Sequence, residues 1–226
     1  MFKFSVNGQI LSGRQVLSAL DVTVKTGETH CLLGPSGSGK TTLLNLMAGL
    51  QKQNSQPYSE GKDSADTLWG PAKPDIGYLF QQPRLLPWRT VLQNLLLVEP
   101  DKHIVIDFLK EVRLEEYVNY YPSEISLGMA RRIALVRCLL LKPDLVLMDE
   151  PLTSLDLPTA REMRGLIKRL ICDDPTRSMI YVTHDLDEVL ELGDSVSIIG
   201  GSPSKIIYEN SVEDVSRQEL EDLLEH

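Results

Sequence analysis

Short apolar runs recur along this chain, and stretches with the apolar spacing of a helix follow most of them. We predict strands at the runs THCLL (29–33), IGYLF (76–80), LVLMD (145–149), MIYVT (179–183) and SVSII (195–199). Runs that are apolar at nearly every position are typical of strands buried on both faces. Strands of this kind that alternate with helices predict an α/β fold with a mainly parallel sheet.

The first 26 residues follow a different pattern, in which apolar and polar positions alternate. Phe2, Phe4 and Val6 form one such series, and Leu20, Val22 and Val24 form a second. Alternation with a period of two indicates strands with one buried face. We therefore expect an antiparallel strand pair ahead of the parallel sheet.

Two stretches interrupt the alternation of strands and helices. Residues 51–75 are rich in Ser, Gly, Pro, Gln and Asp, which predicts a long and mobile surface excursion. Residues 85–140 contain no strand pattern, and apolar residues near their end repeat at helical spacing: Met129, Ile133, Val136 and Leu140. This second stretch predicts a helical insertion between strands.

Length and composition favour one folded domain. With 226 residues, 42% of them hydrophobic, the chain can bury a substantial core. We expect a single domain over 1–226, with a core formed by 1–84 and 141–226 and a helical subdomain formed by 85–140. No apolar run reaches the roughly 18 residues that a membrane span needs, so we expect a soluble chain.

Charge and cysteine content narrow the classes of function. The formal net charge of -9 provides no general attraction to nucleic acid, and we expect no nucleic-acid partner. Cys31, Cys138 and Cys172 lie far apart and lack the spacing of a metal site. We interpret them as three reduced thiols in a cytoplasmic protein.

The segment LLGPSGSGKTT (32–42) contains the pattern G-x-x-x-x-G-K-[ST] between a predicted strand and a helix-like stretch. Glycines let backbone N–H groups surround phosphate oxygens, and a helix N-terminus adds its positive dipole. Lysine neutralises the β- and γ-phosphates, and the threonine hydroxyl coordinates Mg²⁺. We expect the nucleotide-binding residues to be Gly34, Pro35, Ser36, Gly37, Ser38, Gly39, Lys40, Thr41 and Thr42.

The segment LVLMDEP (145–151) places two carboxylates directly at the end of a buried strand. Open α/β sheets bind ligands at the carboxyl ends of their strands. Asp149 is predicted to hold Mg²⁺ through its coordination shell, and Glu150 to act as the general base for an attacking water.

These motifs, together with three further ones in the same order, resemble the ATP-binding subunit of an ABC transporter over nearly the whole chain. The segment GYLFQQPRLLPW (77–88) is similar to the family's Q loop, which implies that Gln81, or the adjacent Gln82, reaches toward Mg²⁺ and the water. TSLD (153–156) resembles the D loop and contains Asp156, and YVTHD (181–185) contains a switch histidine, His184. The resemblance implies an ATPase with the cofactors ATP and Mg²⁺.

The segment SEISLGMARRIALVRC (123–138) resembles the family signature, which begins a helix with Ser126 at its N-cap. In the family, this helix start caps the γ-phosphate bound by a second copy. The resemblance therefore implies a homodimer in the ATP-bound state, with Ser126, Gly128 and Met129 acting in trans.

The chain departs from the family pattern at three points. The polar excursion after residue 50 stands where the family usually has a compact strand and turn. Leu127 stands where the family has the first signature glycine. A leucine there is costly if the position needs positive φ and nearly neutral if it is helical. The family also stacks adenine on an aromatic residue upstream of the P loop, where this chain has only Leu11 and Val16 nearby. An aliphatic surface would hold the base more weakly than a ring does.

The resemblance also implies a mode of action. ATP closes the dimer, and hydrolysis removes the bridging phosphate and reopens it. A separate transmembrane permease would receive this motion, and a solute-binding protein would complete the transporter. The chain would then lie in the cytoplasm, peripheral on the inner face of the cell membrane. Within the family, it is most similar to the importers for nitrate, sulfonate, taurine and thiamine precursors.

Two other functions remain open at this point. One is a soluble ABC-type ATPase that acts outside transport, on nucleic acid or translation; the other is a P-loop kinase. Leu85, Leu86 and Trp88 either form an apolar groove for a helix of the permease or are buried inside the helical subdomain. Leu220, Leu223 and Leu224 predict a C-terminal surface helix that folds back on the domain, with a regulatory or partner-binding role left open.

Overall fold

The computed structural model of the protein describes residues 1–54, 68–69 and 73–225. One eight-stranded sheet runs through the molecule, in the spatial order β1-β2-β8-β7-β3-β6-β5-β4. The strands are β1 (Phe2–Leu11), β2 (Arg14–Val24), β3 (Thr29–Leu33), β4 (Ile76–Leu79), β5 (Leu145–Asp149), β6 (Ser178–Thr183), β7 (Ser195–Gly201) and β8 (Ser204–Ser211).

The sheet is parallel from β7 to its edge at β4, and its opposite end contains the antiparallel pairs. Strands β7, β3, β6, β5 and β4 pair in parallel. β1 pairs antiparallel with β2, and β7 antiparallel with β8. A single parallel pair, Leu17 with Ser204, joins β2 to β8. The predicted α/β fold with a mainly parallel sheet and an antiparallel part is therefore confirmed.

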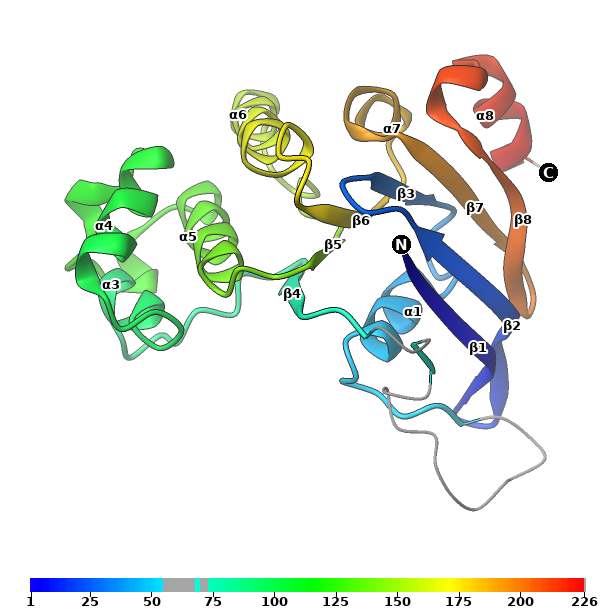
Figure 1. The fold of residues 1–226 in the computed structure, drawn as a ribbon, viewed down its shortest axis with the longest axis horizontal. Coiled ribbons are helices and arrows are strands. Elements are labelled where there is room, and N and C mark those ends of the chain that lie inside the picture. Colours follow the sequence, from blue (N-terminus) through cyan, green and yellow to red (C-terminus); the bar gives the residue numbers. More distant parts are fainter. Residues whose placement is uncertain (55–67, 70–72, 226) are drawn as a thin grey trace.

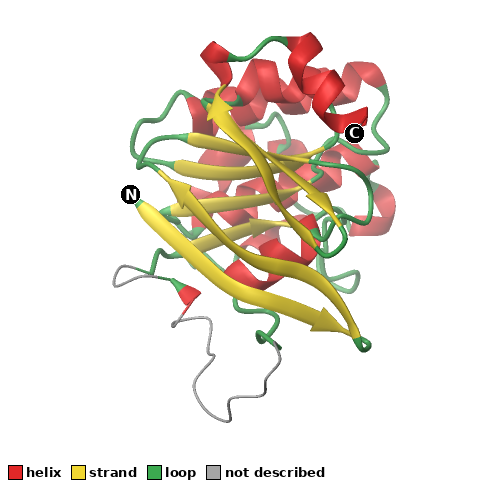
Figure 2. Cartoon of the chain, turned by 90° about the vertical axis from the view of Figure 1, so that its right-hand side faces the viewer, coloured by secondary structure: helices red, strands yellow, loops and turns green. Residues whose placement is uncertain are grey.

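Helices cover both faces of the parallel strands, and further helices lie at one end of the molecule (Figure 1). Viewed from the side in Figure 2, the strands cross in front of most of the helices. The helices are α1 (Lys40–Met47), α3 (Val91–Leu95), α4 (Lys102–Glu111), α5 (Leu127–Leu140), α6 (Leu157–Ile167), α7 (Leu186–Leu192) and α8 (Arg217–Glu225). Short helical turns occupy Glu115–Tyr117, Pro122–Glu124, Lys168–Cys172 and Val212–Asp214.

Three apolar clusters hold these layers together. The first lies between one face of the sheet and α5 to α8. The second lies on the other face, where α1 packs between the parallel strands and the β1–β2 hairpin. The third lies within the group formed by α3, α4 and α5. Because β3, β5 and β6 are buried along their whole length, their apolar runs match strands covered on both faces.

The strand predictions were correct except for one missing strand and small errors of boundary. β3 and β5 match the predicted ranges, and β4, β6 and β7 differ from theirs by one or two residues. The predicted antiparallel pair is β1 with β2. β8 was missed, because its apolar residues Ile206, Ile207 and Tyr208 are only half-buried or exposed and lie between polar residues.

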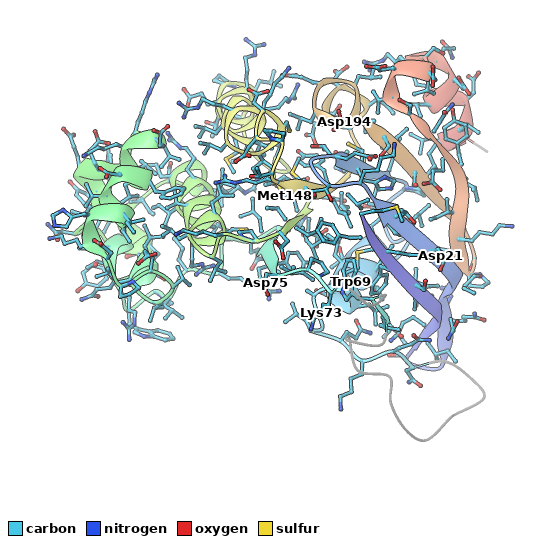
Figure 3. All side chains as sticks on the ribbon, viewed as in Figure 1. Asp21, Trp69, Lys73, Asp75, Met148 and Asp194 are labelled. Atoms are coloured by element: carbon cyan, nitrogen blue, oxygen red, sulfur yellow. The ribbon has the colours of Figure 1, made fainter. Side chains whose placement is uncertain are left out.

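The predicted surface excursion covers residues 51–75, most of which lie outside the described residues. Its predicted mobility is therefore not tested. The described part differs from the expectation at Trp69, which is only 3% exposed. Its indole Nε1 donates to the carbonyl of Met47 (2.9 Å), and its ring packs edge-on against Phe4. Figure 3 shows Trp69 close to α1 and β1. A polar stretch thus contributes one aromatic anchor to the core.

The predicted helical insertion and C-terminal helix both form. No strand occurs within 85–140, all of which the structure describes. The exact division into core and helical subdomain stays a prediction. α8 folds back with Leu220 fully buried, and Leu223 and Leu224 pack against the first cluster. The three cysteines are free thiols.

Candidate functional site

The P loop connects β3 to α1 and leaves the start of that helix open. Gly39 precedes α1 in the left-handed region (φ 84°), and no side chain caps the helix. The N–H groups of the first turn therefore lack intrahelical acceptors and face outward as anion donors. Gly37 also has positive φ (80°). A Cβ on Gly34 would lie 2.4 Å from the carbonyl oxygen of Ile199, so only glycine fits at that position.

Lys40 is only 4% exposed at the first position of α1. Its Nζ donates to the carbonyls of Gly34 (2.8 Å) and Pro35 (2.9 Å) and lies 3.8 Å from Glu150 Oε1. Burial lowers the pKa of Lys40, while Glu150 and Asp149 act in the opposite direction. The ammonium group is thus held against the inside of the loop that would surround phosphates.

The next residue, Thr41, reaches the end of β5. Its hydroxyl donates to Asp149 Oδ1 at 3.1 Å, and Asp149 is 5% exposed. Burial raises the pKa of Asp149, and the hydrogen bond from Thr41 lowers it in part. Two oxygen atoms, one neutral and one acidic, therefore lie together at the carboxyl edge of the sheet. Met148, next to Asp149, lies in the middle of the molecule in Figure 3.

Glu150 follows Asp149 with a strained backbone. Its φ is 46°, an uncommon value for a residue with a side chain, and its N–H donates to the carbonyl of Val182 (3.0 Å) on β6. This turn aims the carboxylate toward Lys40. Thr153 donates its hydroxyl to Glu150 Oε2 at 3.2 Å. Such strain is typical of functional positions.

His184 follows β6 and approaches the same carboxylate. Its Nδ1 lies 3.5 Å from Glu150 Oε2, and its side chain is 56% exposed. Asp185, directly after it, caps α7 by accepting from the N–H of Asp187 (2.8 Å). The structure therefore brings Lys40, Glu150 and His184 together from three separate segments.

Gln81 is not part of this group. It is exposed just beyond β4, where Gln81 and Gln82 line a pocket that also contains Ser126 and Ser154. Among the described residues, Gln81 shows no hydrogen bond to Thr41 or Asp149. Its expected role near Mg²⁺ would need a change in the position of this loop.

The signature segment begins α5, as expected. Ser126 is the N-cap, and its hydroxyl accepts from the N–H of Met129 (3.2 Å). Leu127 is the first helical residue and lacks positive φ, so leucine fits there with little strain. Gly128 is buried, and a Cβ on it would lie 2.4 Å from Thr159 Cγ2. The glycine thus permits close packing of α5 against α6.

Asp156, in the D-loop segment, is the N-cap of α6. It accepts from the N–H of Thr159 (2.9 Å) and from its hydroxyl (3.0 Å). The same Thr159 presents its methyl group to Gly128. The signature and the D loop therefore form one contact within the chain.

Two polar residues of this region were not singled out from the sequence, although they lie inside the Q-loop and signature segments. Tyr78 donates to Asn45 Oδ1 (3.4 Å), and burial together with the nearby Asp149 charge raises its pKa. Arg131 is 4% exposed and donates to the carbonyl of Pro151 (2.7 Å), directly after Glu150. Arg131 gives no distinct sequence signal, because it stands beside a second arginine, Arg132, in the signature segment.

These features define a P-loop ATPase whose glycine-rich loop lies at the carboxyl ends of the parallel strands. The sequence model described as "ABC transporter" matches residues 17–153. The chain belongs to the ABC transporter family and is an ATP-binding ATPase of that family.

Relatives and solved structures agree with this assignment. "Aliphatic sulfonates import ATP-binding protein SsuB 2" of Pseudomonas syringae pv. tomato is 35% identical over 207 residues, covering 90% of this chain and 84% of the relative. "Molybdenum import ATP-binding protein ModC" of Photobacterium profundum is 38% identical, covering 81% of this chain and 52% of the relative. The "Dimeric Structure of MJ0796, a Bacterial ABC Transporter Cassette" superimposes with a TM-score of 0.75 at 26% identity, covering 94% of this chain and 99% of that one.

Proposed function

We propose that this protein hydrolyses Mg²⁺-ATP at the P-loop edge and thereby energises import of a small solute through a separate permease. One observation carries the proposal: Lys40, Asp149, Glu150 and His184 meet at the carboxyl ends of neighbouring parallel strands, beside an uncapped helix start. The relatives are named as import ATP-binding proteins, which supports the proposed role in transport.

The phosphates of ATP would lie in the loop formed by residues 34–42. Backbone N–H groups at the start of α1 are available there, and the buried hydroxyl of Ser38 has no partner among the described residues. An unsatisfied buried hydroxyl is costly, and a phosphate oxygen would satisfy it. Lys40 would exchange its two carbonyl contacts for the β- and γ-phosphates.

The residues present also fit Mg²⁺. Thr41 and Asp149 offer two adjacent oxygen ligands, and Mg²⁺ typically takes few protein ligands and completes its octahedron with phosphate oxygens and water. When bound, Mg²⁺ neutralises charge on the β- and γ-phosphates. Gln81 is the third proposed ligand, reached after movement of its loop.

Hydrolysis would depend on Glu150 and His184. Glu150 would accept a proton from the attacking water, and its strained backbone and the bond from Thr153 hold its carboxylate at the phosphate side. His184 would contact the γ-phosphate and orient the carboxylate of Glu150. Neither role involves a covalent intermediate with the protein.

A second copy would complete the site. Ser126, Gly128 and Met129 lie at a helix start whose neighbour Leu127 is 45% exposed, and Leu157 beside Asp156 is 83% exposed. Exposed apolar residues beside a helix N-terminus suit a surface that closes on another subunit and its nucleotide. The dimeric cassette of similar fold supports a twofold arrangement in the ATP state.

Adenine would lie beside the hairpin turn of β1 and β2. A small pocket there is lined by Arg14, Gln15, Val16, Gly37 and residues of the β7–β8 turn. Val16 lies against the P loop at Gly39, whereas Leu11 does not line this pocket. The base would therefore contact Val16 and the Arg14 side chain in place of an aromatic ring.

The permease would dock on the helical end of the molecule. Trp88 is 71% exposed there, while Leu85 packs at the edge of the third cluster. Trp88 thus fits the alternative of a groove for the permease, and Leu85 fits the alternative of burial inside the helical subdomain. Among the described residues, no helix is both long and apolar enough to cross a membrane. Attachment to the inner face of the membrane would come through the permease, and a solute-binding protein would deliver the solute.

The test combines catalysis with assembly. The purified chain should hydrolyse ATP in the presence of Mg²⁺ and stop when EDTA is added. Tagged protein expressed in its own host should co-purify with an integral membrane protein from detergent extracts. Hydrolysis without a membrane partner, together with co-purification of ribosomes or nucleic acid, would instead favour an ABC-type ATPase outside transport.

A further inference from the structure

A buried carboxylate lies directly beneath the segment that contains His184. Glu188 on α7 is 7% exposed, and its Oε2 accepts from the hydroxyls of Tyr181 (2.9 Å) and Thr183 (2.6 Å). Both hydroxyls belong to β6, which runs into the histidine. Burial raises the pKa of Glu188, and these two hydrogen bonds act in the opposite direction. A buried acid with two donors is a well-satisfied anchor.

The Thr183 hydroxyl connects this anchor to the backbone around His184. It donates its hydrogen to Glu188 and accepts from the N–H of Asp185 at 3.0 Å. A hydroxyl has one donor hydrogen, so its bond to Glu188 leaves the lone pairs free for the N–H. The residues before and after His184 are therefore both tied to Glu188.

His184 itself has little packing to hold it. Its side chain is 56% exposed, and its Nδ1 lies 3.5 Å from Glu150 Oε2. The direction of an exposed ring depends on the backbone that presents it. Small errors matter at such a position, because a misplacement of about 1 Å at a reacting centre can cost about 100-fold in rate.

We propose that Thr183 and Glu188 are positioning residues that fix the direction of His184 toward Glu150 and the γ-phosphate. The inference rests on the proposed function, in which His184 acts in ATP hydrolysis. Neither residue touches the nucleotide; they act through the backbone of 183–185.

Tyr181 provides a matched control. Its hydroxyl donates to the same Oε2 of Glu188, but it lies two residues further from His184 and makes no bond to Asp185. Tyr181→Phe removes one hydrogen bond to Glu188, and Thr183→Val removes both the bond to Glu188 and the acceptor for Asp185. Both changes preserve side-chain size closely.

The experiment measures ATP hydrolysis and thermal unfolding of the full chain with Mg²⁺-ATP. Thr183→Val should lower kcat by about 10- to 100-fold and leave the KM for ATP within about twofold. Tyr181→Phe should lower Tm by about as much as Thr183→Val does, but it should keep kcat within about twofold of the original protein. Thr183→Ser, which retains the hydroxyl, should keep kcat near the original value.

A double-mutant cycle with His184→Ala separates positioning from a structural effect. If Thr183 acts through His184, the double variant should lose no more kcat than His184→Ala alone. Equal kcat losses for Thr183→Val and Tyr181→Phe, or additive losses in the cycle, would overturn the proposal. Full activity of His184→Ala would overturn the assigned role of His184 in the proposed function instead.

A second variant covers the case in which Thr183→Val does not fold. Glu188→Gln retains the shape of the side chain and weakens both hydroxyl contacts. It should lower kcat with an unchanged KM, and this loss should disappear in the His184→Ala background. A loss that persists there would contradict the proposal.

Discussion

The P-loop edge and the signature region, which we propose form the two halves of an ATP site, have opposite character. At the P-loop edge, Lys40 and Asp149 are each about 5% exposed or less; Asp149 accepts from Thr41, and Lys40 lies 3.8 Å from Glu150. At the signature, Ser126 bonds only within its own turn among the described residues, Leu127 is half-exposed and Leu157 is largely exposed. The first half is assembled inside one chain, and the second presents an open surface.

This difference indicates how ATP can act as a switch. In the proposed function, the P-loop half would bind nucleotide without a partner, whereas the signature half would gain its contacts only when a second copy arrives. The closed dimer would therefore be favoured only while the γ-phosphate bridges the halves. The following predictions test this comparison.

The largest effect is expected from Glu150→Gln. Loss of a general base typically costs about 10²- to 10⁴-fold in rate, while the P-loop contacts to phosphate remain. Turnover should nearly vanish, and size-exclusion chromatography with light scattering should show a dimer stabilised by ATP. A monomer at saturating ATP would contradict either the role of the base or the open half-site.

Lys40→Ala should remove nucleotide binding. Truncation of one partner in a buried, charged contact costs about 2 to 5 kcal/mol, and here it also leaves Asp149 and Glu150 without their neutralising cation. The Kd for ATP, measured by calorimetry, should rise by roughly 30-fold or more. Unchanged affinity would refute the phosphate cradle.

Gly128→Ala tests whether glycine is required in the signature segment because α5 packs closely against α6. The new methyl group would clash with Thr159 Cγ2, and overpacking of this kind costs about 1 to 3 kcal/mol. Denaturant unfolding should show that loss, and adding Thr159→Ser should restore most of it by removing the methyl group while keeping the hydroxyl that donates to Asp156.

The matched control for this change is Gly165→Ala. Gly165 lies in α6, and a Cβ there would meet open space, so stability should stay the same or rise slightly. If Thr159→Ser fails to restore stability in the Gly128→Ala background, the contact with α6 is not the cause.

The smallest effect is expected from Leu127→Gly. Because Leu127 is helical and half-exposed, glycine should cost at most about 1 kcal/mol of stability. The ATPase rate should rise or stay unchanged in a steady-state assay. A sharp fall in the ATPase rate would show that Leu127 contributes to the function of the signature half.

Sequence patterns predicted the fold class and most strands correctly, and the P loop and the signature segment lie at helix starts as expected. The catalytic and ligand roles of the predicted site residues stay predictions. β8 was missed because its apolar residues are few and only half-buried or exposed. Trp69 was missed because it stands in a polar stretch whose composition gives no sign of its burial. Gln81 lies on the signature side, since a loop residue takes its direction from packing that no motif encodes.

By itself, the sequence determined the local features: buried strands, the helix cap at Ser126, and the glycine-rich loop ahead of α1. These features depend on residues a few positions apart, so spacing is enough to reveal them. Only the tertiary structure decided which distant side chains meet, such as Thr183 with Glu188, Gly128 with Thr159 and Arg131 with Pro151. Such contacts arise when separate elements pack together, and their partners leave no periodic mark in the chain.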